Sequence, residues 1–124
     1  MICPLLTYAD MQQAMAELAE VFGLQIVWFG DEVAEIRWHG GVAVAQTDQP
    51  EALHGSHAGQ GWTYVQVLDP DAHYTATLHR GGLVLGEPHS DPSGAQRGYS
   101  ARDREGNIWT FGSHQFGATI GHDR

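Results

Sequence analysis

Cysteine and long apolar runs are the two things this sequence has least of. Cys3 is the only cysteine, so no internal disulfide can form, as is typical of chains that fold in a reducing cytoplasm. No stretch approaches the roughly 18 consecutive apolar residues of a membrane-spanning helix. The first residues carry no basic segment ahead of an apolar one, so we expect no secretory signal. These absences predict a cytoplasmic protein without membrane contact.

Basic side chains are also scarce. Six basic residues stand against 15 acidic ones, and the formal net charge is −9. Nucleic-acid binding requires a basic surface, so we expect no nucleic-acid partner. An acidic protein attracts cationic small molecules over long distances, although negative charge also serves simply to keep a protein in solution. Charge therefore excludes one class of partner without selecting another.

The first half of the chain has the pattern of one strand, one helix and three further strands. Residues 1–8 are mostly apolar, and Asp10 has the character of a helix N-cap. Apolar residues then recur at helical spacing until Gly23, which fits the end of a helix. The stretches that follow predict strands over 24–29, 33–38 and 42–46.

A polar, glycine-containing linker over residues 47–60 precedes a second copy of this pattern. The copy, which begins near residue 61, consists of an expected strand at 62–68, a helix at 72–80 and a strand at 83–85. The N-cap and the terminating glycine are 13 residues apart in both halves, from Asp10 to Gly23 and from Asp69 to Gly82. An internal repeat of this size predicts an α+β fold built from two βαβββ modules.

Residues 97–112 have the pattern of a β-hairpin that completes the second module. An alternating strand leads into the polar turn 103–107, and the second strand, 108–111, returns beside it. Gly106 is the residue best able to supply the positive φ that such a turn needs. The last residues, 115–124, show no periodicity, so we expect them to form a tail.

Two stretches resemble the vicinal oxygen chelate superfamily, which includes glyoxalases, ring-cleaving dioxygenases, fosfomycin-modifying enzymes and bleomycin-resistance proteins. They are the strand–helix segment 62–74 and the hairpin segment 102–109, set in paired βαβββ modules. The resemblance covers about residues 1–114 and implies a single domain with two curved mixed sheets that form a cavity, each sheet backed by a helix. It also implies a homodimer in which the partner chain often completes the cavity. Because this scaffold hosts enzymes and binders alike, it implies no single chemistry.

Metal-using members of the superfamily carry His, Gln or Glu on the first and last strands of each module. The matching positions here, each to within one residue, are Cys3, Ala45, Thr63 and Thr110. Such a set does not supply the nitrogen and oxygen ligands that a catalytic divalent metal needs, so we expect no metal and no cofactor. Alternation predicts two faces for the last strands: a cavity face of Ala43, Ala45, Ile108 and Thr110, and an opposite face of Val42, Val44 and Trp109.

Other patterns that carry chemistry are weak. His54 and His57 lie three residues apart in the linker, but solvated loop histidines are the simpler interpretation. Cys3 has no base near it in the sequence, so a buried strand cysteine is a simpler interpretation than a nucleophile. Neither a nucleophile elbow nor a phosphate-binding glycine loop is present. The sequence therefore assigns no catalytic residue.

The aromatic residues are more informative, because all four tryptophans fall in predicted strands. Aromatic walls suit flat or hydrophobic ligands and, in acidic surroundings, cationic ones. Tryptophan also fills protein cores, which we favour for Trp109, whereas Trp38 and Trp62 fit either role. The predicted ligand-binding set is Trp38, Trp62, Tyr64, Tyr99, Thr63, Thr110, Ala45 and Cys3.

Together these features predict a metal-independent protein that binds a small hydrophobic or aromatic molecule, neutral or cationic. The specific hypothesis is resistance to an antibiotic by sequestration, as in bleomycin-resistance proteins. One alternative is a metal-dependent lyase, isomerase or dioxygenase that holds its metal in a displaced geometry. Another is an interaction protein with a vestigial cavity. The sequence does not identify the ligand.

Overall fold

The structure, a computed structural model, describes residues 1–116. The first module consists of β1 (Leu5–Tyr8), α1 (Met11–Glu20), β2 (Gln25–Trp28), β3 (Val33–Trp38) and β4 (Gly41–Thr47). The second consists of β5 (Trp62–Gln66), α2 (Pro70–His79), β6 (Leu83–Val84), β7 (His89–Ser90), β8 (Arg97–Arg102) and β9 (Ile108–Gly112). The predicted α+β fold with paired βαβββ modules is confirmed. The expected tail lies, from residue 117 on, outside the described residues.

Strand β7 is an addition to the predicted plan, in a stretch expected to be a polar loop. It pairs with the start of β8, His89 opposite Gly98 and Ser90 opposite Arg97. Two exposed polar residues are too few to show a period-two pattern in the sequence. The partner strand alone makes this segment a strand.

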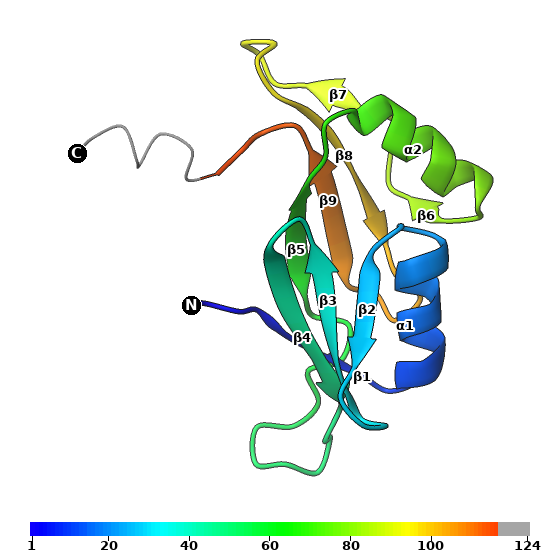
Figure 1. The fold of residues 1–124 in the computed structure, drawn as a ribbon, viewed down its shortest axis with the longest axis vertical. Helices are drawn as coiled ribbons and strands as arrows, with labels where there is room; N and C mark the ends of the chain where they lie inside the picture. Colours follow the sequence, from blue (N-terminus) through cyan, green and yellow to red (C-terminus); the bar gives the residue numbers. More distant parts are fainter. Residues whose placement is uncertain (117–124) are drawn as a thin grey trace.

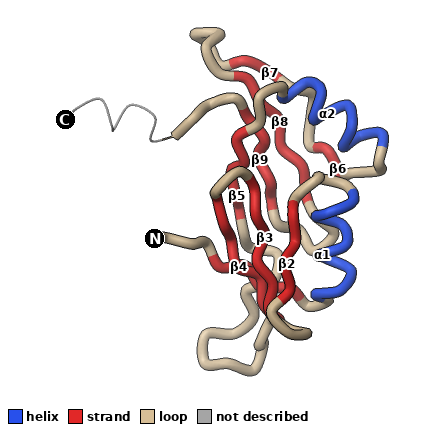
Figure 2. The backbone as a smooth tube through the Cα atoms, in the orientation of Figure 1, coloured by secondary structure: helices blue, strands red, loops and turns tan. Residues whose placement is uncertain are grey.

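Each module folds into its own mixed sheet (Figure 1). The strand orders are β1-β4-β3-β2 and β5-β9-β8-β6. β1 is parallel to β4 and β5 is parallel to β9, whereas the other neighbours are antiparallel. The first strand of each module is therefore an edge strand beside the last one. Figure 2 shows both helices on the same side of the two sheets.

Both helices follow the N-cap residues that the sequence predicts, although α2 begins at Pro70, two residues before the expected start. The Asp10 carboxylate accepts a hydrogen bond from the Gln13 N–H at 3.1 Å, and the Asp69 carboxylate accepts one from the Ala72 N–H at 3.1 Å. Gly23 follows α1 with a φ of +76°, a conformation that glycine adopts without steric cost. Within the described part of the chain, neither helix has the length and apolar character needed to cross a membrane.

The two modules share one hydrophobic core. Leu18 of α1 and Phe22, just after this helix, are buried together with Val65, Trp109 and Phe111 of the second module. The rings of Phe22 and Phe111 stack with their centroids 5.6 Å apart. Because the core is continuous, each module depends on the other for burial of its apolar face.

The side chains of β4 and β9, the last strands of the two modules, point in directions that differ from the prediction. Ala45 of β4 is fully buried opposite Leu6, and Trp109 and Phe111 of β9 are buried in the same core. Thr110, which lies between these two, points to the opposite side of its sheet. The prediction that Ala45 and Thr110 share a cavity face is therefore wrong. A shift of one residue between the modules is enough to reverse the facing.

The turn of the β8–β9 hairpin connects the modules through side chains. Tyr8 donates its hydroxyl to Asp103 at 2.7 Å, and Glu105 accepts hydrogen bonds from the N–H groups of Ala9 at 2.6 Å and Asp10 at 2.8 Å. Burial and the neighbouring Asp103 carboxylate raise the pKa of Tyr8, so this phenol stays protonated and remains a donor. The sequence predicted this turn, but not that it binds the first module.

His73 of α2 forms a second connection between the modules. Its Nε2 lies 3.0 Å from the Phe22 carbonyl, which only accepts, so Nε2 carries the proton. Nδ1 lies 2.6 Å from the Tyr99 hydroxyl, which also lies 2.8 Å from the Thr77 hydroxyl, so these three side chains form one hydrogen-bonded chain. Burial lowers the pKa of His73 below its usual value, so this imidazole is neutral in the folded protein. Burial also raises the pKa of Tyr99 to about 12, so its hydroxyl remains a donor.

We expect His73 to make the protein less stable in mild acid. The unfolded chain takes up a proton on this histidine below about pH 6.5, whereas the folded protein does so only at lower pH. The free energy of unfolding should therefore fall as the pH drops below about 6.5. Urea unfolding of the wild type and of His73→Gln between pH 5 and pH 8 measures this, with His79→Gln, exposed on the same helix, as control. An equal pH slope for wild type and His73→Gln contradicts the prediction.

Candidate ligand cavity

A cavity of about 580 Å³ lies between the two modules. The start of β4 (Gly41–Ala43) lines it on one side, and residues 63–68 line it on the other. Ile36 and Trp109, both buried in the core, lie at its wall. A volume of this size suits a small organic ligand.

Trp38 is held at this cavity by the local backbone and by a bond to the other module. It is the last residue of β3, before the two-residue turn His39–Gly40, in which φ is +42° and +84°. Two positive φ values are typical of the tight hairpin turn that joins antiparallel strands. The indole Nε1 donates to the Gln66 carbonyl of β5 at 2.7 Å. Trp38 is therefore a fixed aromatic wall that spans from one module to the other.

A second, smaller hollow of about 280 Å³ is lined by residues on the other face of the second sheet, around Trp62. Trp62 is 72% exposed, and its Nε1 donates to the Thr110 hydroxyl at 2.8 Å. Thr110 is in turn 2.7 Å from the Ser100 hydroxyl. These bonds hold a large aromatic surface in place although it faces solvent.

Three side chains line both hollows: Tyr64, His114 and Phe116. The Tyr64 hydroxyl donates to the His114 carbonyl at 2.8 Å, and its ring meets Phe116 edge-on at 4.8 Å. Burial raises the pKa of Tyr64, so the hydroxyl remains a donor. The segment after β9 thus lies between the two hollows and separates them, although the sequence predicted only a tail here. Lack of periodicity hid these residues, because their positions depend on contact with β5.

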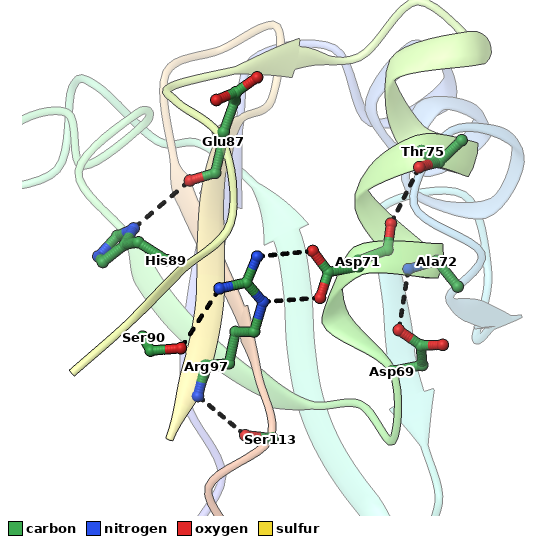
Figure 3. Close-up of polar contacts among 9 residues, drawn as sticks. All are labelled: Asp69, Asp71, Ala72, Thr75, Glu87, His89, Ser90, Arg97 and Ser113. Atoms are coloured by element: carbon green, nitrogen blue, oxygen red, sulfur yellow. Dashed lines mark hydrogen bonds and ion pairs between the residues drawn. The ribbon is translucent and has the colours of Figure 1, made fainter. Parts of the chain in front are cut away.

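The smaller hollow is bordered by the β7–β8 hairpin, which an ion pair attaches to α2. Arg97 binds Asp71 through Nε at 2.7 Å and through a second nitrogen at 2.8 Å (Figure 3). The remaining guanidinium nitrogen donates to the Ser90 hydroxyl at 3.3 Å. This pairing holds the pKa of the Asp71 carboxyl below its usual range. The Arg97 charge is therefore engaged within the protein.

The predicted ligand-binding residues separate into three groups. Trp38, Thr63 and Tyr64 line the larger cavity. The smaller hollow is lined by Trp62, Tyr64, Tyr99 and Thr110. Ala45 and Cys3 line neither hollow, the first because it is buried in the core and the second because it lies ahead of β1. Sequence reasoning missed His39, Gln66, His114 and Phe116, which line the larger cavity.

The larger cavity has no Asp, Glu, Lys or Arg side chain among its described lining residues. The smaller hollow includes one of each sign, Asp91 and Arg97. The net charge of −9 is therefore spread over other surfaces and gives the larger cavity no local preference for a cation. Its walls favour a neutral, apolar ligand.

The resemblance seen in the sequence raises the question of a metal ion, and the donors present do not fit one. Within residues 1–116, no three His, Cys, Asp or Glu side chains come together as a metal site would require. His54 and His57 approach to 4.7 Å between ring centroids in the linker, but this pair has no third ligand among those residues. The positions expected to carry ligands hold Ala45, buried in the core, and Thr110, bonded to Trp62.

No protein-family model and no curated protein matches the sequence, whereas solved structures do. TioX from Micromonospora sp. ML1 is 26% identical, with a TM-score of 0.77 over 93% of this chain and 100% of that chain. Lactoylglutathione lyase from Agrobacterium tumefaciens is 22% identical, with a TM-score of 0.70 over 90% and 92%. A glyoxalase/bleomycin resistance protein/dioxygenase from Nocardioides is 15% identical, with a TM-score of 0.70 over 95% and 85%. The chain has the fold of the glyoxalase/bleomycin resistance protein/dioxygenase superfamily, the vicinal oxygen chelate group that its sequence resembles.

Proposed function

We propose that this protein binds a small, flat, largely apolar molecule in the cavity between its modules, without a metal ion, and acts by sequestering it. The observation that carries this proposal is the composition of the cavity: Trp38, Tyr64 and Phe116 stand in a mostly apolar lining that has no Asp, Glu, Lys or Arg among its described residues. Such walls bind by burying apolar area and by stacking. An aromatic antibiotic is the ligand class that fits this surface and the fold. The cytoplasmic location stays a prediction.

We propose in addition that the protein is a homodimer. Leu68 and Phe116 line the larger cavity and yet are largely exposed, as are Met1, Ile2 and Leu5 near the N-terminus. Exposed apolar side chains at a binding site, such as Leu68 and Phe116, favour a covering partner. A second copy of the chain is the partner that the fold suggests, and the mass in solution by light scattering tests it.

Tryptophan fluorescence tests the binding function. We expect 2-ethylnaphthalene and N-methyl-2-naphthamide to quench it with saturation at one molecule per chain, in buffer with or without EDTA. Trimethyl(2-naphthylmethyl)ammonium is the cationic comparison, and we expect it to bind no more tightly than the neutral probes. Both neutral probes should be recovered chemically unchanged, because the site sequesters its ligand and does not convert it.

Metal analysis of protein purified without chelator distinguishes the rival function. A metal-dependent lyase, isomerase or dioxygenase requires stoichiometric zinc, nickel, manganese or iron. Such a metal, lost when Cys3 is replaced by alanine, would contradict sequestration without metal. Absence of quenching by every naphthalene probe would contradict the binding function itself.

A further inference from the structure

The larger cavity lies along the edge of β5. Residues 63–68 are consecutive, and all six line the cavity. Successive side chains of a strand point to opposite faces of its sheet. A space that meets the last four residues of β5 and the two that follow them therefore runs along the strand's edge.

This edge of β5 carries hydrogen-bonding groups. Among the strands of residues 1–116, β5 pairs with β9 alone. The Gly61 carbonyl accepts from the Ile108 N–H at 2.9 Å, and the Val67 N–H donates to the Gly112 carbonyl at 2.8 Å. In a parallel ladder alternate residues point toward the neighbour, so the odd-numbered residues face β9. The N–H and C=O groups of Tyr64 and Gln66 consequently face away from β9.

The bond from Trp38 confirms this direction, because its indole N–H reaches the Gln66 carbonyl at 2.7 Å from the first module. The N–H groups of Tyr64 and Gln66 have no hydrogen-bond partner among residues 1–116. A backbone N–H in an apolar cavity is costly when it is desolvated without a partner. A ligand that fills the cavity must therefore offer an acceptor or lose affinity.

The opposite wall has a similar edge. Gly41–Ala43 also line the cavity as consecutive residues. β1 pairs with β4 only from Val44 onward, and the Val44 N–H donates to the Pro4 carbonyl at 2.9 Å. By the same alternation, the N–H and C=O groups of Val42 point to the side of β4 on which β1 lies, but beyond the end of β1. Two backbone edges thus border one apolar cavity.

We infer that the ligand carries a secondary amide between these edges, so that it is recognised in part as a short added strand would be. This inference rests on the proposed binding function and narrows its ligand class to aromatic amides. The N–H and C=O of a trans amide point in opposite directions. The ligand carbonyl accepts from the β5 edge at Gln66, while its N–H faces the β4 edge at Val42. The aromatic part occupies the space beside Trp38.

A proline substitution tests the contact at Gln66. Gln66→Pro removes the N–H, and proline is tolerated on an edge strand whose N–H faces away from its neighbour. Gln66→Ala loses the same side chain but keeps the N–H. N-methyl-2-naphthamide offers the amide, and 2-ethylnaphthalene has the same ring system with a smaller alkyl group in its place. Binding of both probes is measured by fluorescence titration for the two variants and the wild type.

We expect Gln66→Pro to weaken binding of N-methyl-2-naphthamide about three- to tenfold, the range for one hydrogen bond. Gln66→Ala is the reference for this loss, because it lacks the same side chain but keeps the N–H, and 2-ethylnaphthalene should bind Gln66→Pro and Gln66→Ala alike. Equal effects of Gln66→Pro on both probes would overturn the inference while leaving the binding function intact. Failure of both probes to bind the wild type would instead contradict the proposed function.

If Gln66→Pro does not fold, an NMR measurement on the wild-type protein tests the same contact between the ligand and the Gln66 N–H. In the wild-type protein, N-methyl-2-naphthamide should shift the Gln66 amide proton downfield and slow its exchange with solvent. 2-Ethylnaphthalene should do neither. The same response to both probes would contradict the amide contact.

Discussion

Replacing Asp103 by alanine is expected to lower the free energy of unfolding by about 3–5 kcal/mol, because several buried donors lose their acceptor together. Asp103 is 2% exposed. Its carboxylate accepts from the Tyr8 hydroxyl at 2.7 Å, the Trp109 indole at 3.2 Å and the Asn107 backbone at 3.0 Å. Alanine would leave these groups buried without a partner, and would also remove the bond that joins Tyr8 of the first module to the hairpin of the second.

Urea unfolding followed by circular dichroism measures the loss. Asp91→Ala is the matched control, since that carboxylate also accepts bonds in a turn, from the Ser93 hydroxyl at 2.7 Å. It lies in the β7–β8 loop and is not part of the core, so its midpoint should hardly change. Tyr8→Phe removes a single donor and should cost about 1 kcal/mol. An Asp103→Ala midpoint equal to that of Asp91→Ala would show that the turn does not stabilise the fold.

Replacing Trp38 by alanine is expected to weaken binding of N-methyl-2-naphthamide by about 10- to 100-fold. The indole is the aromatic wall that spans both modules, and loss of one such contact corresponds to about 1.5–3 kcal/mol. Trp38→Phe loses the N–H that binds the Gln66 carbonyl. Because it keeps an aromatic surface, it should retain most of the affinity for the probe. The titration is the one used for the wild type, with urea unfolding to confirm that each variant is folded.

Trp62→Ala is the control for this experiment. Both tryptophans were expected from the sequence to contact the ligand, but Trp62 lines the smaller hollow on the other face of the second sheet. Its removal should therefore leave binding in the larger cavity within about twofold of the wild type. A large loss of affinity for Trp62→Ala, with no loss for Trp38→Ala, would show that the probe binds in the smaller hollow.

The elements and their order were determined by the sequence, because the signals are local. Asp10 and Asp69 cap their helices as predicted. Gly106 has a φ of +103° in the hairpin turn, as a residue without Cβ allows. The repeat of these signals at one spacing was enough to predict two βαβββ modules. These features depend on a few neighbouring residues, and tertiary contacts had no reason to override them.

The site was decided by the tertiary structure. Whether Ala45 or its neighbour faces the cavity depends on strand register, where one residue reverses every side chain. Phe116 borders the cavity because it packs on Tyr64, 52 positions earlier in the chain, and no local pattern marks such a contact. The free edge of β5 exists only because no strand pairs with it among residues 1–116. The sequence thus determined the two modules, and their packing against each other determined the cavity, since its walls come from strands distant in the chain.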